Sequence, residues 1–209
     1  MSGFSQRHRR QHAVARAWSV LRDEGLRSFS LKLASELGYR RLLLLERPLS
    51  EPIPDQLPRL PVGVDVLPRR AAGDYLAFRP HAAGTSIFDR WHAGHLCFVA
   101  RDGDRVVSAC WVATRNAWTD YLGCTIDMAP GDAYLFDAFT LPAYRGRGIA
   151  LTLCTRQLRY LAQAGYRRAI RATLPENQAA VAMHTRAGFR PIGMVVRFRI
   201  GPWQKIVRR

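Results

Sequence analysis

Hydrophobic and polar residues follow two different periods along the chain, and the change of period separates expected strands from expected helices. Residues 12–24 and 30–37 repeat their apolar positions with the period of a helix. A short apolar run at 41–47 fits a strand or a helix, and we expect a strand. Five prolines between residues 48 and 61 then indicate a linker. We therefore expect a boundary near residue 60.

Beyond this linker the pattern predicts a mixed order of strands and helices. Short or alternating apolar segments predict strands at residues 62–67, 96–101, 105–114, 121–128, 133–140, 168–173 and 190–200. Helical spacing predicts helices at residues 73–78, 86–93, 148–164 and 178–187. A meander of strands followed by a β-α-β-α-β order is typical of an α+β domain.

Composition limits the class of protein. Apolar residues make up 48% of the 209 residues, which is too many for a disordered chain. The longest run of aliphatic residues, Leu42 to Leu45, is too short to span a membrane. We expect a main domain at residues 61–209, preceded by an extension of helices, a strand and the linker at residues 1–60.

The positive charge gathers at the C-terminal end. The chain carries a net charge of +16, and residues 141–209 hold 14 basic residues and one acidic residue. An anionic partner is therefore expected to meet the last third of the chain. All basic residues except two lysines are arginine, which is consistent with a GC-rich, bacterial-like genome.

The cysteines favour a reducing compartment. They are widely spaced, stand in apolar surroundings and form no Cys-x-x-Cys pair, which argues against a metal cage or a disulfide framework. A cytoplasmic location is the default expectation. These residues are Cys97, Cys110, Cys124 and Cys154.

The segment between the expected strand at 133–140 and the expected helix at 148–164 is rich in glycine and arginine. Gly146 and Gly148 allow a tight backbone bend, and the N-terminus of the helix offers unpaired N–H groups. Arg145 and Arg147 add positive charge. These features predict a site for an anion such as a pyrophosphate. A turn with solvated arginines is the alternative.

Two motifs in this order resemble the GCN5-related N-acetyltransferase (GNAT) superfamily. Arg145, Gly148 and Ala150 match its pattern Arg/Gln-x-x-Gly-x-Gly/Ala after a strand. Asn177 opens a second segment that ends in Gly188-Phe189 and resembles the family's Asn-x-x-Ala…Gly-Phe. The resemblance covers residues from about 62 to 200.

The resemblance implies a fold, a cofactor and a reaction. The fold would be an α/β/α sandwich in which a mixed, twisted sheet splays apart at the cofactor site. The cofactor would be acetyl-CoA or another acyl-CoA, and the reaction would be direct attack of a small-molecule primary amine on its thioester. The implied cofactor residues are Ala138, Phe139 and Thr140 along the strand, Asn177, and Arg145, Gly146, Arg147, Gly148, Ile149 and Ala150 in the loop and helix start.

Two residues are candidates for proton transfer. His184 stands where the family has a tyrosine acid, and an imidazolium with a pKa near 6.5 could protonate a thiolate; a packed histidine, with water as the acid, is the alternative. Asp137 stands where the family often has a base or substrate ligand; an ordinary strand carboxylate paired with an arginine is its alternative. A CoA-binding module without catalysis stays open, as does a transferase for longer acyl chains or membrane-linked acceptors.

Other partners are less strongly indicated. His92 and His95 resemble half of a metal pair but lack further ligands at a suitable spacing, so no metal is expected. The basic N-terminal region could touch an anionic membrane, although a packed extension is favoured and nucleic acid is not expected. A homodimer is left open. The amine acceptor is not identified, but residues 74–95 and 115–132 are expected to surround it.

Overall fold

A computed structural model describes residues 38–55, 58–81, 84–115 and 117–208. The helices expected at residues 12–24 and 30–37 lie outside this range. Contacts divide the chain into two units. The larger unit is Leu42–Met194, and the smaller one joins the two ends, of which 38–41 and 195–208 are described.

The larger unit is built on a mixed sheet with the strand order β1-β8-β7-β4-β3-β2. Strands β7 and β8 run parallel, and the other neighbours are antiparallel. The strands are β1 (Tyr39–Pro48), β2 (Gly63–Val66), β3 (Leu96–Asp102), β4 (Arg105–Ala113), β7 (Asp132–Thr140) and β8 (Arg168–Thr173). The apolar run at 41–47 is thus a strand, as expected, and it belongs to the main sheet although it precedes the expected boundary at residue 60.

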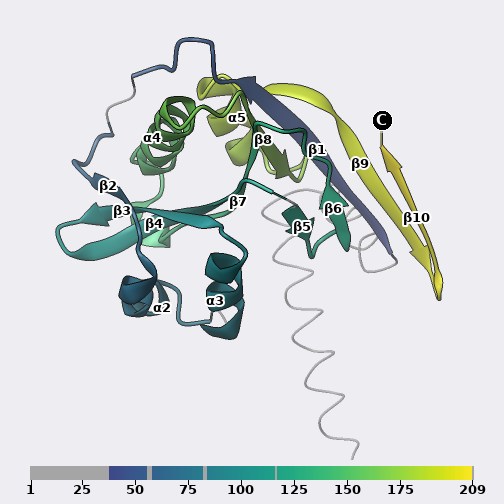
Figure 1. Ribbon diagram of the computed structural model, residues 1–209, viewed down its shortest axis with the longest axis horizontal. Helices are drawn as coiled ribbons and strands as arrows, with labels where there is room; N and C mark the ends of the chain where they lie inside the picture. The colour runs from purple at the N-terminus through teal and green to yellow at the C-terminus, as the bar shows by residue number, and fades with distance from the viewer. Residues whose placement is uncertain (1–37, 56–57, 82–83, 116, 209) are drawn as a thin grey trace, which may run out of the picture. The chain divides into compact units, whose positions relative to one another are not determined.

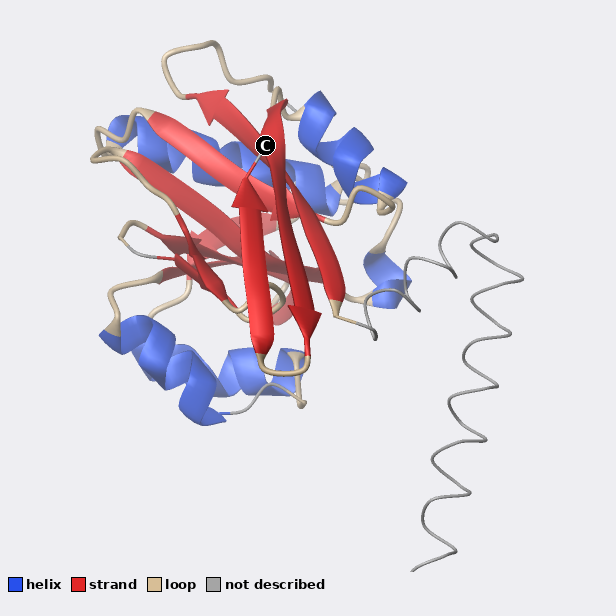
Figure 2. Ribbon diagram, turned by 90° about the vertical axis from the view of Figure 1, so that its right-hand side faces the viewer, coloured by secondary structure: helices blue, strands red, loops and turns tan. Residues whose placement is uncertain are grey.

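Helices cover both faces of this sheet, which confirms the α/β/α arrangement. Figure 1 shows α4 (Ile149–Gln163) and α5 (Gln178–Arg186) on one face of β4 and β7, and α2 (Ala72–Phe78) and α3 (Gly84–His92) on the other. The 3₁₀ turn η1 (Arg69–Ala71) leads into α2. Figure 2 gives a second view of the helices, in blue, on either side of the strands. Within the described residues, no helix is long and apolar enough to cross a membrane.

Each face has its own apolar core. Leu151, Leu158 and Leu161 of α4 pack with strand residues on one face. On the other face, the fully buried Trp111 packs edge-on against Tyr75 at a ring distance of 5.6 Å. The alternation of apolar side chains along β4 therefore serves two cores.

Two strand expectations need correction. The strand expected at 121–128 is only β6 (Cys124–Ile126), which pairs with β5 (Ala117–Thr119) in a separate ribbon, because a turn ending at Gly123 (φ +60°) interrupts it. Strand β9 (Arg190–Ile200), whose residues from 195 onward belong to the smaller unit, continues into a hairpin with β10 (Trp203–Arg208), a strand that the sequence pattern did not indicate.

Helices α4 and α5 end in the same motif. The N–H of Phe189 donates to His184 O and that of Gly188 to Thr185 O, which is a Schellman cap with glycine at the left-handed position. Gly165 occupies the same position after α4, with φ +82° against +86° at Gly188. Their surroundings differ: a Cβ at Gly188 would lie on the guanidinium of the buried Arg47, whereas a Cβ at Gly165 meets nothing within 4 Å.

Gly188→Ala is expected to lower the free energy of unfolding by about 3 kcal/mol, and Gly165→Ala by only about 1 kcal/mol. Both variants place alanine at positive φ, which costs about 1–2 kcal/mol. Gly188→Ala also displaces Arg47, whose Nη2 donates to Pro52 O at 2.7 Å, and a lost charged hydrogen bond costs about 2 kcal/mol. Urea unfolding of the two variants measures the difference; equal losses would contradict the packing of Arg47 under Gly188.

Candidate active site

The parallel strands β7 and β8 separate halfway along their length. Their pairing ends at Leu135 and Arg171, whereas β7 continues to pair with β4 as far as Thr140. From Phe136 onward, the edge of β7 that faced β8 has no partner strand within the described part of the chain. Such an edge offers a row of main-chain donors and acceptors to an extended ligand. The splayed sheet expected from the sequence is confirmed, and Ala138, Phe139 and Thr140 lie on its open edge.

A bulge marks the start of the open edge. Ala109 and Trp111 of β4 lie opposite Phe139 and Phe136 of β7, so β7 contains one extra residue there. Asp137 at this bulge has φ +49°, the sole non-glycine residue with positive φ among the described residues. A left-handed conformation costs a residue other than glycine about 1–2 kcal/mol. Strain of this kind is typical of functional positions, where surrounding contacts hold it.

The glycine-rich loop follows the open edge directly. Gly146 and Gly148 have φ values of +75° and +82°, which side chains other than glycine rarely adopt, and Gly148 is the N-cap of α4. The carbonyl of Gly148 accepts from the N–H groups of Leu151 and Thr152. The N–H groups of residues 146–150, which come before these two in the chain, have no acceptor within the described residues. They lie at the positive end of the α4 dipole, as an anion site requires.

The arginines of the loop differ in their contacts. Arg145 Nε donates to Thr140 O at 3.2 Å, and its guanidinium lies over the Phe139 ring at 5.8 Å, which ties the loop to the open edge. Arg147 lies over Tyr144 at 5.5 Å. Both side chains are exposed. The loop therefore adds two positive charges beside the free amides.

Asn177 caps the second helix. Its Oδ1 accepts from Ala180 N at 3.1 Å at the start of α5. This contact accounts for the asparagine as a helix N-cap. Its expected contact with a cofactor stays a prediction.

His184 lies on the α5 side of the sheet and is buried, with 3% of its surface exposed. Its ring packs edge-on against Phe189 at 5.8 Å, and its Nδ1 has no hydrogen-bond partner within the described residues. Burial, together with the charge of Arg171, lowers the pKa of His184 to about 3. The imidazolium expected from the sequence is therefore not present at neutral pH, and an acid at this position would have to be the neutral ring N–H.

Asp137 lies on the opposite face, between α2 and α3. Its carboxylate accepts from Arg79 Nη1 at 2.6 Å and from Arg90 Nη1 at 2.5 Å. Although burial alone would raise the pKa of Asp137, the hydrogen bonds and charges of the two arginines hold it below the usual value. A carboxylate with a low pKa is a weak proton acceptor. The structure does not bring His184 and Asp137 together, because they face opposite sides of the sheet.

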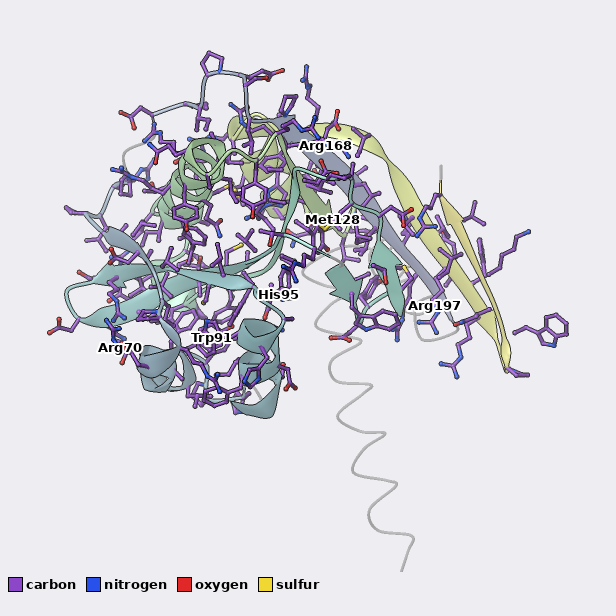
Figure 3. All side chains as sticks on the ribbon, in the orientation of Figure 1. Arg70, Trp91, His95, Met128, Arg168 and Arg197 are labelled. Atoms are coloured by element: carbon purple, nitrogen blue, oxygen red, sulfur yellow. The ribbon has the colours of Figure 1, made fainter. Side chains whose placement is uncertain are left out.

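The sequence indicated His95 only as part of an incomplete metal-binding pair with His92. The ring of His95 lies edge-on to Phe136 at 5.4 Å, next to the bulge. His95 directly precedes β3, and Figure 3 shows it beside α3. Burial and the charge of Arg90 lower its pKa, so the ring is neutral at pH 7. No cluster of metal-ligating side chains occurs in the described ranges. A neutral imidazole near the open edge is suited to accept a proton.

Comparison with known proteins agrees with this geometry. The model of the acetyltransferase (GNAT) family matches residues 67–189. A mycothiol acetyltransferase from Salinispora tropica is 31% identical over 200 residues, which are 89% of this chain and 63% of that protein. This chain therefore spans less than two thirds of the length of its curated relative.

Solved structures share the fold at lower identity. A GCN5-related N-acetyltransferase from Sphaerobacter thermophilus superimposes with a TM-score of 0.52 at 19% identity, covering 87% of this chain and 57% of that one. The aminoglycoside N-acetyltransferase AAC(6')-Iy, in complex with a bisubstrate analogue of CoA, gives a TM-score of 0.51 at 19% identity and covers 69% and 98%. The splayed sheet, the glycine loop and the family match over residues 67–189 lead to one conclusion: the chain belongs to the acetyltransferase (GNAT) family.

Proposed function

We propose that this protein transfers the acetyl group of acetyl-CoA to a primary amine of a small molecule. The observation that carries the proposal is the open edge of β7 from Phe136 to Thr140, which leads directly into the glycine loop and the free amides at the start of α4. Family membership and the CoA analogue bound to the structural relative AAC(6')-Iy support it. The four buried, free cysteines fit a reducing compartment, and we propose the cytoplasm.

In this proposal, two groups of the described residues would hold acetyl-CoA. Amides of residues 146–150, with Arg145 and Arg147 beside them, would hold the pyrophosphate. Main-chain groups of Ala138, Phe139 and Thr140 would pair with the pantetheine amides as an added strand. Acetyl-CoA would supply the acetyl group as a thioester.

The protein's own groups would prepare the amine. An amine attacks only after its ammonium proton has been removed, which requires a proton acceptor on the α2/α3 side of the open edge. His95 suits this role better than Asp137, because its ring is neutral and has no arginine bonded to it within the described residues. We propose that Asp137 positions the two arginines and that His184, if it acts, donates from a neutral ring.

The direct test is release of CoA thiol from acetyl-CoA in the presence of a panel of primary amines. The proposal predicts thiol release that depends on the amine, with one acetylated amine formed per thiol. Binding of acetyl-CoA without acetylation of any amine would instead favour the CoA-binding module without catalysis.

His95→Gln is expected to lower kcat by about 100-fold, because a general base contributes about 10²–10⁴-fold to the rate. The affinity for acetyl-CoA should not change, because His95 precedes β3 and belongs neither to the glycine loop nor to the open edge of β7. His92→Gln is the matched control, because His92 is an exposed histidine three residues earlier on α3. Steady-state kinetics with calorimetric binding measures both; equal activity of the two variants would exclude His95 as the base.

A further inference from the structure

We infer that Arg79 and Arg90 form a binding site for an oxyanion of the amine substrate, so that the preferred acceptor is an amine that also carries a carboxylate or a phosphate. This inference rests on the proposed function and concerns the same site.

The charges of the cluster do not cancel. Arg79 and Arg90 both donate to Asp137, and the ion pairs of the described residues give neither arginine another carboxylate. Two guanidinium groups with one carboxylate leave a net charge of +1. A partly buried cluster with an unbalanced charge is stabilised when an anion completes the pairing.

The arginines also keep hydrogen-bonding capacity. Each guanidinium has five N–H donors in a planar fork, and the bond to Asp137 uses one from each. Arg79 also interacts with the Tyr75 hydroxyl, and most donors of both groups stay available. The Arg79 side chain is 33% exposed and the Arg90 side chain 23% exposed, so a ligand can reach them. Planar forks of this kind bind carboxylate and phosphate oxygens in pairs.

Aromatic rings hold both guanidinium groups in place. Arg79 lies over the Phe139 ring at 5.1 Å. Arg90 lies over Trp111 at 5.2 Å and over Phe136 at 5.3 Å. Figure 3 shows Trp91, which packs edge-on to Trp111 at 5.2 Å, between α3 and the sheet. Donors fixed in this way lose little freedom on binding, which is the condition for a specific site.

The position of the cluster connects it to the reaction. Asp137 lies at the bulge where the edge of β7 opens, and its positive φ directs the carboxylate to the two arginines. Phe136 and Phe139, which flank the bulge, are the rings on which the arginines rest. An oxyanion bound by Arg79 and Arg90 would therefore lie on the α2/α3 side, with the attached amine facing the open edge.

Matched amines test the inference. The panel compares an amino acid with its amide, and phosphoethanolamine with ethanolamine. The wild-type protein is expected to prefer one anionic amine over its neutral partner by about 10- to 100-fold in kcat/KM, the range of one or two charged hydrogen bonds. Comparing the preference within the amino acid pair with that within the phosphoethanolamine pair shows whether the site prefers a carboxylate or a phosphate.

Arg90→Gln should abolish this preference, measured as the ratio of kcat/KM between the anionic and the neutral member of a pair, because a change in the pKa of His95 affects both members alike. Arg90→Lys keeps the charge but loses the fork, so it should restore only part of the preference. Arg69→Gln is the matched control, because Arg69 also rests on a ring, that of Phe88 at 5.4 Å, but has no bond to Asp137. A wild-type preference for the neutral amines, or an equal loss for both members of a pair in Arg90→Gln, would overturn the inference.

A binding measurement separates this inference from the proposed function. With acetyl-CoA at saturation, acetate and inorganic phosphate are titrated while the Nε–H NMR signals of the arginines are followed. Saturable shifts at Arg79 and Arg90, but not at Arg69, support the oxyanion site even if no amine in the panel is acetylated. Shifts at Arg79 and Arg90 no larger than that at Arg69 would contradict it even if acetylation is observed.

Discussion

Replacing Gly148 with valine is expected to weaken acetyl-CoA binding by about 30-fold or more. Gly148 has φ +82° at the N-cap of α4, and a β-branched residue is strongly disfavoured there. Valine at this φ would strain the backbone by about 2 kcal/mol. If the loop changes its conformation to relieve this strain, the amides of residues 146–150 no longer point in one direction, and about 2 kcal/mol corresponds to about 30-fold in affinity. A Cβ at this position contacts Pro58 at 3.5 Å, an ordinary distance, so backbone conformation rather than a clash causes the effect.

Gly165→Val is the matched control for this change. Gly165 has the same φ of +82° and lies at the other end of α4, with nothing within 4 Å of its Cβ position. Both variants should lose comparable stability, measured as melting temperature, but only Gly148→Val should lose affinity for acetyl-CoA in calorimetric titration. Comparable affinities in the two variants would show that the amides at the start of α4 do not hold the cofactor.

Acidification is expected to destabilise the protein through His184. Its pKa is 6.5 when exposed and about 3 in the folded protein, so the unfolded chain binds the proton first as the pH falls. The stability from the neutral ring is complete above pH 6.5 and decreases by about 1.4 kcal/mol per pH unit down to about pH 3. Between pH 6.5 and 4.5 the loss is about 3 kcal/mol. His95, whose pKa is also lowered, acts in the same direction.

His184→Phe isolates this contribution. Phenylalanine keeps a ring against Phe189 and does not titrate. The free energy of unfolding of this variant, measured in urea, should therefore change less with pH between pH 6.5 and 4.5, and the difference in slope should correspond to about one proton. Asp137 and Asp132, whose pKa values are lowered, lose their contributions only below pH 4, outside this window. His92→Gln, a change at an exposed histidine, is the control for a histidine substitution that alters no buried group. A variant His184→Phe with the wild-type slope would mean that His184 is not buried in its neutral form.

Local patterns were sufficient to predict the glycine loop and the helix that follows it. The glycine loop and α4 are contiguous in sequence, and their residues carry backbone requirements that hold wherever they occur. The same is true of the Schellman glycine Gly188 after α5. For these reasons the glycine loop and the start of α4 could be placed from the sequence, whereas the splay of the sheet was implied by the resemblance to the family. The contacts of residues 145–150 with a cofactor stay a prediction.

The cluster of Arg79, Arg90 and Asp137 could not be predicted in this way. Arg79 and Arg90 meet Asp137 across 58 and 47 residues, and nothing local to an arginine identifies its distant partner. One signal was present: Phe136 and Phe139 are an odd number of positions apart, so a regular strand would place them on opposite faces. Both contact the α2/α3 core, which requires an extra residue between them. The protonation of His184 also depends on burial and on Arg171, which the local sequence does not reveal.

The most direct test of the central claim is calorimetric titration of the full chain with acetyl-CoA, with free CoA beside it. We expect one binding site of micromolar affinity for acetyl-CoA and competition by free CoA, because both present the same pyrophosphate and pantetheine to the α4 amides and the open edge of β7. Absence of binding by folded protein, verified by a cooperative thermal transition, would contradict it.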